Sequence, residues 1–196
     1  MSLSHDEIHR RLPTLALIDD PDVREETADL AARAPSYFWE VPASRSTYHH
    51  PLCRGRHGLW IHTLQLSTVI ERLADSVVGR GELSPLEIDL ARAAAILHDM
   101  RKNGPPSDAA DSSVSDHDLR MASEIRTESE LDERVADAVA SHMGPWYDGP
   151  TPSTPLEELV HTADMIASTA TIAVSIQGPI PTELRDLDEL EEVDLR

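Results

Sequence analysis

Apolar residues recur along this chain at the three- and four-residue spacing of α-helices rather than at the two-residue spacing of strands. Within 58–79, for example, Leu59, Leu66, Leu73 and Val77 form one stripe at helical spacing. No segment alternates apolar and polar residues for long enough to predict a strand. We therefore predict an all-α, single-domain helical bundle. Its helices are expected over 5–17, 22–34, 58–79, 85–100, 116–128, 130–142 and 155–176.

Capping sequences mark several of these helix starts. Ser84–Glu87 and Thr154–Glu157 both place a hydroxyl at the N-cap, a proline at the first helical position and a glutamate at the third. Ser4 and Glu7 form a weaker version of the same pattern.

The breaks between helices are too short to separate domains. Proline- and glycine-containing turns occupy 103–115 and 143–154. We expect N-terminal helices in 1–48 to pack on a core at 49–177. An acidic tail at 178–196 follows, and we expect it to be a frayed helix or a solvated segment.

Charge restricts the partners that this chain can have. The 36 acidic residues outnumber the 17 basic ones, which gives a formal net charge of −19. Such a field repels phosphates, so extended nucleic acid is not an expected partner. Lys102 is the only lysine, and a carboxylate-rich surface with almost no lysine is typical of proteins adapted to a very salty cytoplasm. Halophilic adaptation is therefore our hypothesis for the surface.

Other features favour a soluble cytoplasmic protein. The longest aliphatic run, Ala93–Leu97, is far shorter than the roughly 20 residues that cross a bilayer. The first ten residues contain an acidic pair and no apolar stretch, so we expect no secretory signal. Cys53 is the only cysteine, which excludes an internal disulfide and fits a reducing compartment. The sequence makes no prediction of oligomeric state.

The segment Ala91–Lys102 carries the most informative chemistry. It ends a small, apolar helix with the adjacent pair His98-Asp99, and Lys102 follows three residues later. Burying such a pair is costly unless a partner such as a metal ion binds both side chains. Chance or helix-end capping explains an isolated His-Asp pair equally well. Further histidines and an aspartate lie on separate predicted helices, as metal ligands do in helical bundles: His62, His117, His142 and Asp164.

Together these residues resemble the HD-domain phosphohydrolase superfamily, over roughly His49 to Ser168. The local sequence is most similar to that of the HD domain of bacterial 3′-to-5′ exoribonucleases, in His49-His50, Gly58-Leu59 and His62-Thr63. The resemblance implies that one metal ion is held by His62, His98, Asp99 and Asp164. It also implies that His117 and His142 hold a second ion, with Asp99 bridging the two.

The resemblance further implies an enzyme with two divalent transition metal ions per chain, of Fe, Mn, Zn or a similar element. The ions would share a hydroxide that attacks phosphorus. Asp99 and Lys102 are the candidate catalytic residues, and Arg56 or Arg101 would help Lys102 to neutralise the phosphoryl oxygens. We expect the substrate to be a phosphomonoester or phosphoanhydride of a small, nucleotide-like molecule. The alternatives are a phosphodiesterase or exonuclease on short oligonucleotides and a non-catalytic nucleotide-sensing module.

Several side chains have two interpretations. His50, with Arg56, Arg101 and Trp146, is a candidate substrate contact, and His50, His57 and His161 are candidate general acids. His161 stands three residues before Asp164, so we expect it to orient that carboxylate. His57 is expected to cap a helix or contact substrate. Trp146 and Tyr147 either stack on a base or cover the open end of the bundle. His5 and His9, four residues apart, are either ordinary surface residues or a fortuitous metal site.

Overall fold

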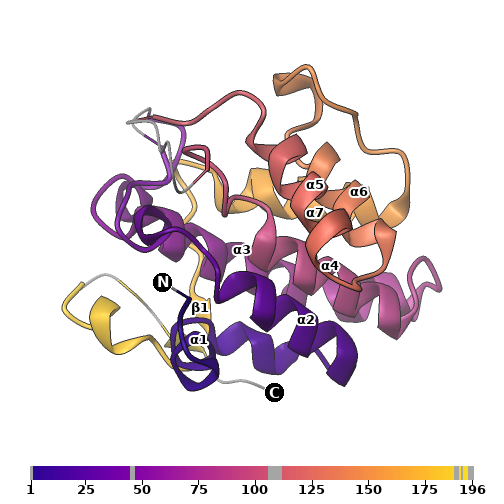
Figure 1. Cartoon of the computed structure of the whole chain (residues 1–196), viewed down its shortest axis with the longest axis horizontal. Helices are drawn as coiled ribbons and strands as arrows, with labels where there is room; N and C mark the ends of the chain where they lie inside the picture. Colours follow the sequence, from indigo (N-terminus) through magenta and orange to yellow (C-terminus); the bar gives the residue numbers. More distant parts are fainter. Residues whose placement is uncertain (1, 45–46, 106–111, 188–189, 191, 194–196) are drawn as a thin grey trace.

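The computed structural model describes residues 2–44, 47–105, 112–187, 190 and 192–193. These residues form seven α-helices arranged as one bundle (Figure 1). The prediction of an all-α fold is thereby confirmed. The helices are α1 (His5–Arg11), α2 (Pro21–Ala31), α3 (Gly58–Gly79), α4 (Pro85–Leu97), α5 (His117–Glu128), α6 (Glu133–Ser141) and α7 (Pro155–Ala167).

Helix α4 lies in the middle of the bundle. It packs against α2, α3, α6 and α7, and almost every residue from Ile88 to Leu97 is buried. The small side chains of Ala93, Ala94 and Ala95 allow these neighbouring helices to approach closely on all sides. The residues that follow α4, His98 and Asp99, consequently lie in the centre of the molecule.

The predicted capping sequences begin the helices as expected. At α4 the hydroxyl of Ser84 accepts from the N–H of Glu87, whose carboxylate accepts from the N–H of Ser84, so the capping box is complete. At α7 the hydroxyl of Thr154 accepts from the N–H of Glu157. The carboxylate of Glu157 instead accepts from the N–H of Ser153, one residue earlier than in a capping box. Ser4 caps α1 in the same way as Thr154 caps α7.

Two predicted helices end well before their predicted ends. The helix expected over 5–17 ends at Arg11, and a 3-10 helix, η1 (Pro13–Leu17), follows, because Pro13 has no N–H to continue the α-helical ladder. The helix expected over 155–176 ends at Ala167. The β-branched residues beyond it, from Thr169 to Ile176, favour extended backbone.

The tail expected to be frayed or solvated is structured where it is described. Ile176–Gln177 (β1) pairs in parallel with Glu192–Val193 (β2), and the N–H of Gln177 donates to the hydroxyl of Thr68 on α3. A short 3-10 helix, η5 (Thr182–Leu184), buries Leu184 completely. Ile180, Leu184 and Leu187 pack this segment on the bundle.

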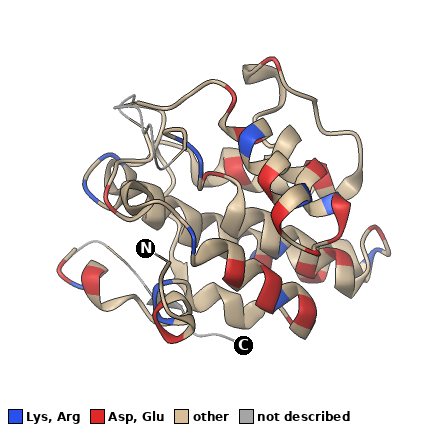
Figure 2. Ribbon diagram, in the orientation of Figure 1, with Lys and Arg blue, Asp and Glu red and all other residues tan. Residues whose placement is uncertain are grey.

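Acidic residues, drawn in red, are spread over several helices and loops of the ribbon (Figure 2). Among the described residues, no helix combines the length and the apolar character that crossing a bilayer requires.

Candidate metal centre

The six predicted metal ligands converge from five different helices. All are buried, with at most 4% of each residue exposed. His62 projects from the buried half of α3 and Asp164 from α7, while the others lie at helix ends: His98 caps α4, Asp99 follows it, His117 begins α5 and His142 caps α6.

The start of α3 depends on a glycine. A Cβ on Gly58 would lie 2.1 Å from the carbonyl oxygen of Cys53, so no other residue fits without moving that turn. The close approach sets where α3 begins, one turn before His62.

Short distances link the side chains into one cluster. Nε2 of His62 lies 3.0 Å from Oδ1 of Asp164 and 3.3 Å from Nε2 of His98. Asp99 stands between two groups of histidines: its Oδ2 lies 3.4 Å from Nε2 of His98, and its Oδ1 lies 2.9 Å from Nε2 of His117. Nε2 of His142 is 3.8 Å from the same Oδ1. The two oxygens of one carboxylate thus face different histidines.

Three of the histidines are oriented by the backbone in the same way. Nδ1 of His98, His117 and His142 each lies against the carbonyl oxygen three residues earlier, at 2.8, 2.9 and 2.6 Å. Only a protonated Nδ1 can donate to a carbonyl, so each neutral ring keeps its lone pair on Nε2, and that atom faces the cluster. Backbone contacts of this kind commonly orient histidine ligands of metal ions.

The buried nitrogen and oxygen atoms in the centre lack hydrogen-bond partners. Nε2 of His117 and of His142, together with Oδ1 of Asp99, makes no hydrogen bond of acceptable geometry among the described residues. Two sets of three ligand atoms lie within 4.8 Å of one another: His62, His98 and Asp164, and His98, Asp99 and His142. Buried polar atoms without partners are costly, and a cation that binds their lone pairs removes that cost. The donor set therefore fits divalent metal ions.

The electrostatics of His142 and of the two carboxylates favour the forms that bind metal. Burial lowers the pKa of His142 to about 3, which keeps its imidazole neutral. Burial by itself would raise the pKa of Asp99, but the Lys102 ammonium and His98 beside it hold that pKa well below the usual range. The pKa of Asp164 is likewise lowered, against the effect of burial, by its contact with His62. Both carboxylates are consequently ionised at neutral pH.

A family comparison agrees with this geometry. The model of the HD domain family matches residues 59–169, which is more than half of the chain and contains all six ligands. The chain belongs to the HD domain family. The family consists of metal-dependent phosphohydrolases, and its domains bind divalent metal ions. No curated protein and no solved structure matched the chain.

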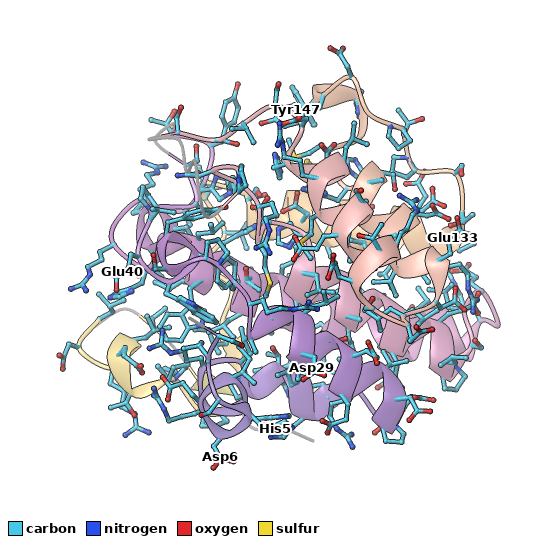
Figure 3. The ribbon with its side chains drawn as sticks, viewed as in Figure 1. His5, Asp6, Asp29, Glu40, Glu133 and Tyr147 are labelled. Atoms are coloured by element: carbon cyan, nitrogen blue, oxygen red, sulfur yellow. The ribbon has the colours of Figure 1, made fainter. Side chains whose placement is uncertain are left out.

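A cavity of about 890 Å³ opens beside the centre of this HD domain. Asp164 and Lys102 line it on the side of the metal ligands, and Lys102 Nζ forms an ion pair with Oδ2 of Asp99. Trp146 and Tyr147, which follow α6, also line it, and the ring of Tyr147 packs edge-on against His117 (Figure 3).

Some predicted substrate contacts lie elsewhere. Arg56, Arg101 and His50 are not among the described residues that line the cavity. Arg56 pairs with Glu40 on an exposed part of the surface (Figure 3), and Arg101 pairs with Glu124 on α5. Carboxylates bind both guanidinium groups. The positions of these arginines near the predicted ligands in the sequence do not reveal such pairing. Trp146 alone of the four predicted contacts borders the cavity.

The sequence missed His49. This residue lines the cavity, is 8% exposed, and packs its ring edge-on against His62 with centroids 5.0 Å apart. Its neighbour His50 turns away and accepts a hydrogen bond from the N–H of Leu52 at Nδ1. We had expected His50 to contact the substrate, because the sequence alone does not reveal which of two adjacent histidines faces the site.

Two other histidines act on the backbone. Nδ1 of His161 lies 2.7 Å from the carbonyl oxygen of His142, so His161 holds the turn after α6. We had expected it to orient the carboxylate of Asp164. His57 occupies the N-cap of α3 as expected, but its Nδ1 contacts the carbonyl of Trp39 instead of a helix N–H.

Proposed function

We propose that this HD domain hydrolyses a phosphomonoester or phosphoanhydride of a small, nucleotide-like substrate. The observation that carries the proposal is the shared cavity, which is lined by the ammonium group of Lys102, by Asp164 of the proposed metal centre and by aromatic rings. A volume of about 890 Å³ is in the usual range for small-molecule sites, roughly 300–1,000 Å³. It suits a mononucleotide better than extended nucleic acid.

The cluster offers places for two cations. His62, His98 and Asp164 would hold one ion, and Asp99, His117 and His142 the other, with the carboxylate of Asp99 between them. Imidazole and carboxylate ligands without thiolates suit Fe, Mn, Zn or similar divalent ions. Bound ions supply Lewis acidity and a nucleophile at neutral pH.

Lys102 would neutralise the phosphoryl group. Burial opposes its charge, but the carboxylate of Asp99 raises the pKa of Lys102 above its usual value, so the ammonium persists. A fixed positive charge next to the metal ligands stabilises negative charge that develops on phosphoryl oxygens. The ion pair with Asp99 keeps that charge at the cavity wall.

Aromatic side chains at the cavity favour a nucleobase. Trp146 and Tyr48 both line it, and they are 65% and 74% exposed. Stacking on an exposed aromatic ring contributes about 1–3 kcal/mol per base. We propose that the base lies against these rings while the phosphate lies against Lys102.

A substrate screen tests this function. The metal-loaded protein should release phosphate from nucleoside 5′-phosphates, and Asp99→Asn should abolish the release. Trp146→Ala should raise KM for a nucleoside monophosphate but leave KM for ribose 5-phosphate unchanged. Cleavage of dinucleotides to mononucleotides, with no phosphate release, would make the protein a phosphodiesterase instead. Tight nucleotide binding without turnover in the presence of Fe²⁺, Mn²⁺ or Zn²⁺ would make it a sensor.

A further inference from the structure

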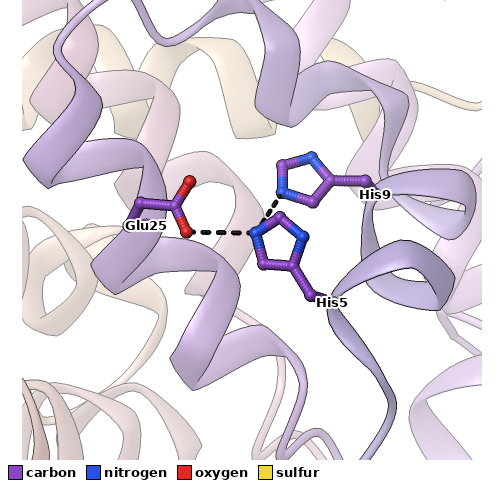
Figure 4. Close-up of side chains that lie close together, drawn as sticks. All are labelled: His5, His9 and Glu25. Atoms are coloured by element: carbon purple, nitrogen blue, oxygen red, sulfur yellow. Dashed lines mark hydrogen bonds and ion pairs between the residues drawn. The ribbon is translucent and has the colours of Figure 1, made fainter.

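A second group of metal-ligating side chains lies outside the segment that matches the HD domain. His5 and His9 stand one turn apart on α1, and Glu25 faces them from α2 (Figure 4). Nε2 of His5 lies 3.0 Å from Oε2 of Glu25 and 3.2 Å from Nε2 of His9. The imidazole centroids of His5 and His9 are 4.3 Å apart.

These contacts cannot all be satisfied by protons. If Nε2 of His5 carries the proton, it donates toward Glu25 or toward His9, since one N–H points in one direction. If Nε2 of His9 carries the proton and donates to His5, the carboxylate of Glu25 faces a bare nitrogen lone pair. Either way, one of the two contacts has no hydrogen between its atoms. A cation between the three atoms satisfies every contact at once.

We propose that His5, His9 and Glu25 form a binding site for a divalent transition metal ion, of which Zn²⁺ fits best, separate from the HD centre. Two imidazole nitrogens and one carboxylate oxygen are ligands that Zn²⁺ accepts, with water completing a tetrahedral shell. The three ligand atoms already lie within 4.8 Å of one another, although they come from two helices. Ligands four residues apart on one helix face are naturally placed for a shared ion.

The surroundings favour a bound cation. A cavity of about 700 Å³ borders His5 and is lined by four carboxylates, against one arginine: Glu26, Asp29, Glu128 and Glu130. Such a concentration of negative charge raises the local concentration of cations.

An ion at this site would join α1 to α2. The last residue of α1 already contacts α3, because the carbonyl of Arg11 accepts a hydrogen bond from the indole of Trp60. The proposed site would therefore stabilise the N-terminal helices against the helix that carries His62.

Zinc binding to matched variants tests the site. Equilibrium dialysis of the whole chain with Zn²⁺ should give one fewer bound ion per chain for His9→Gln or Glu25→Gln than for the wild type. Asp6→Asn, which removes an exposed charge beside His5, should keep the wild-type number. At free Zn²⁺ about 100 times the dissociation constant, the Zn²⁺-induced rise in Tm should be smaller in His9→Gln by about 5 °C.

The Tm of each variant without metal shows whether the substitution alone destabilises the fold. Each Zn²⁺-induced shift is the difference between the Tm of one variant with Zn²⁺ and without it. Equal numbers of bound Zn²⁺ and equal shifts of Tm in the wild type, His9→Gln and Glu25→Gln would overturn the proposal. Loss of an ion from Asp6→Asn as well would also overturn it, since general surface charge would then explain the binding.

Discussion

The phenol oxygen of Tyr37 lies 2.6 Å from the carbonyl oxygen of Gly104. It also lies 3.2 Å from the carbonyl oxygen of Met100, so the two acceptors bracket the turn that carries Lys102. Tyr37 belongs to a 3-10 helix, η2 (Ser36–Trp39), which precedes the segment that matches the HD domain. The N-terminal part of the chain therefore holds the position of the lysine at the cavity.

Removing this hydroxyl should impair turnover without removing metal. Tyr37→Phe leaves the buried carbonyl of Gly104 without its partner, which costs about 1–3 kcal/mol of stability. We expect a lower Tm and a several-fold lower kcat, with the metal content unchanged, measured by calorimetry, phosphate release and elemental analysis. Thr127→Val, which removes a hydroxyl on α5 away from this turn, is the control for stability. An unchanged kcat in Tyr37→Phe would show that the turn is held by other contacts.

Asp99 and Lys102 should separate metal binding from phosphoryl stabilisation. Asp99→Ala removes the carboxylate between the two groups of histidines, so we expect loss of metal and of turnover. Lys102→Ala should keep the metal and lose about 10²–10³ in kcat, as removal of one preorganised charge typically does. Both are measured by elemental analysis and by steady-state kinetics.

Lys102→Arg is the matched control, because it keeps the charge and changes its shape. We expect it to restore little activity, since a planar guanidinium does not replace a compact ammonium at a buried ion pair. Wild-type turnover in Lys102→Ala would instead assign Lys102 to capping the helix that ends at Leu97.

The adjacent histidines 49 and 50 should respond differently to the same substitution. His49 lines the cavity, and its Nε2 lies 3.3 Å from the hydroxyl of Ser168, whereas His50 caps a short 3-10 helix, η3 (Pro51–Cys53). We expect His49→Gln to lower kcat or raise KM about tenfold or more. His50→Gln should change either constant by less than about twofold. The reverse order in steady-state kinetics would contradict the placement of His49 at the substrate.

Acid should weaken the attachment of the C-terminal segment. Hydrogen bonds from Arg10 to Glu183 lower the pKa of Glu183 from its ordinary 4.5 to about 2. The ion pair therefore stabilises the fold fully above pH 4.5, and this contribution is lost as the pH falls toward 2. Glu183→Gln should lower the free energy of unfolding at pH 7, and the difference from wild type should vanish near pH 2. Glu158→Gln, an exposed residue of α7, should show no such convergence in chemical denaturation.

The sequence predicted the bundle because its helices carry their own start sequences and apolar stripes. Ser84 and Thr154 begin their helices where we expected, and α3 matches its predicted range in full. The convergence of the six ligands could be predicted because their spacing resembles a known arrangement. Helical periodicity alone does not predict which distant helices come together. The direction of side chains outside the helices was harder to predict. His49 and His50 are identical in type, and the turn at Pro51 decides which one faces the cavity.

The path of the chain after α7 was also beyond local reasoning. Beyond the helix the chain packs on distant segments, as Gln177 does with Thr68. Arg101 was assigned to the substrate from its place beside Asp99, but Glu124, 23 residues further along, binds it with an Nε-to-Oε2 distance of 2.7 Å. Such long-range partners leave no trace in a local pattern.

The way in which His98, His117 and His142 are oriented affects how this protein tolerates mutation. Each ring is fixed by a main-chain carbonyl, at positions 95, 114 and 139, and every amino acid supplies that oxygen. The side chains at those three positions can therefore be exchanged, within the limits of packing, without releasing the imidazoles. Random mutagenesis should consequently find ligand geometry robust to substitution at these positions. It should be sensitive to proline just after positions 95 and 139, which lie within α4 and α6, because the helix turn there would be lost.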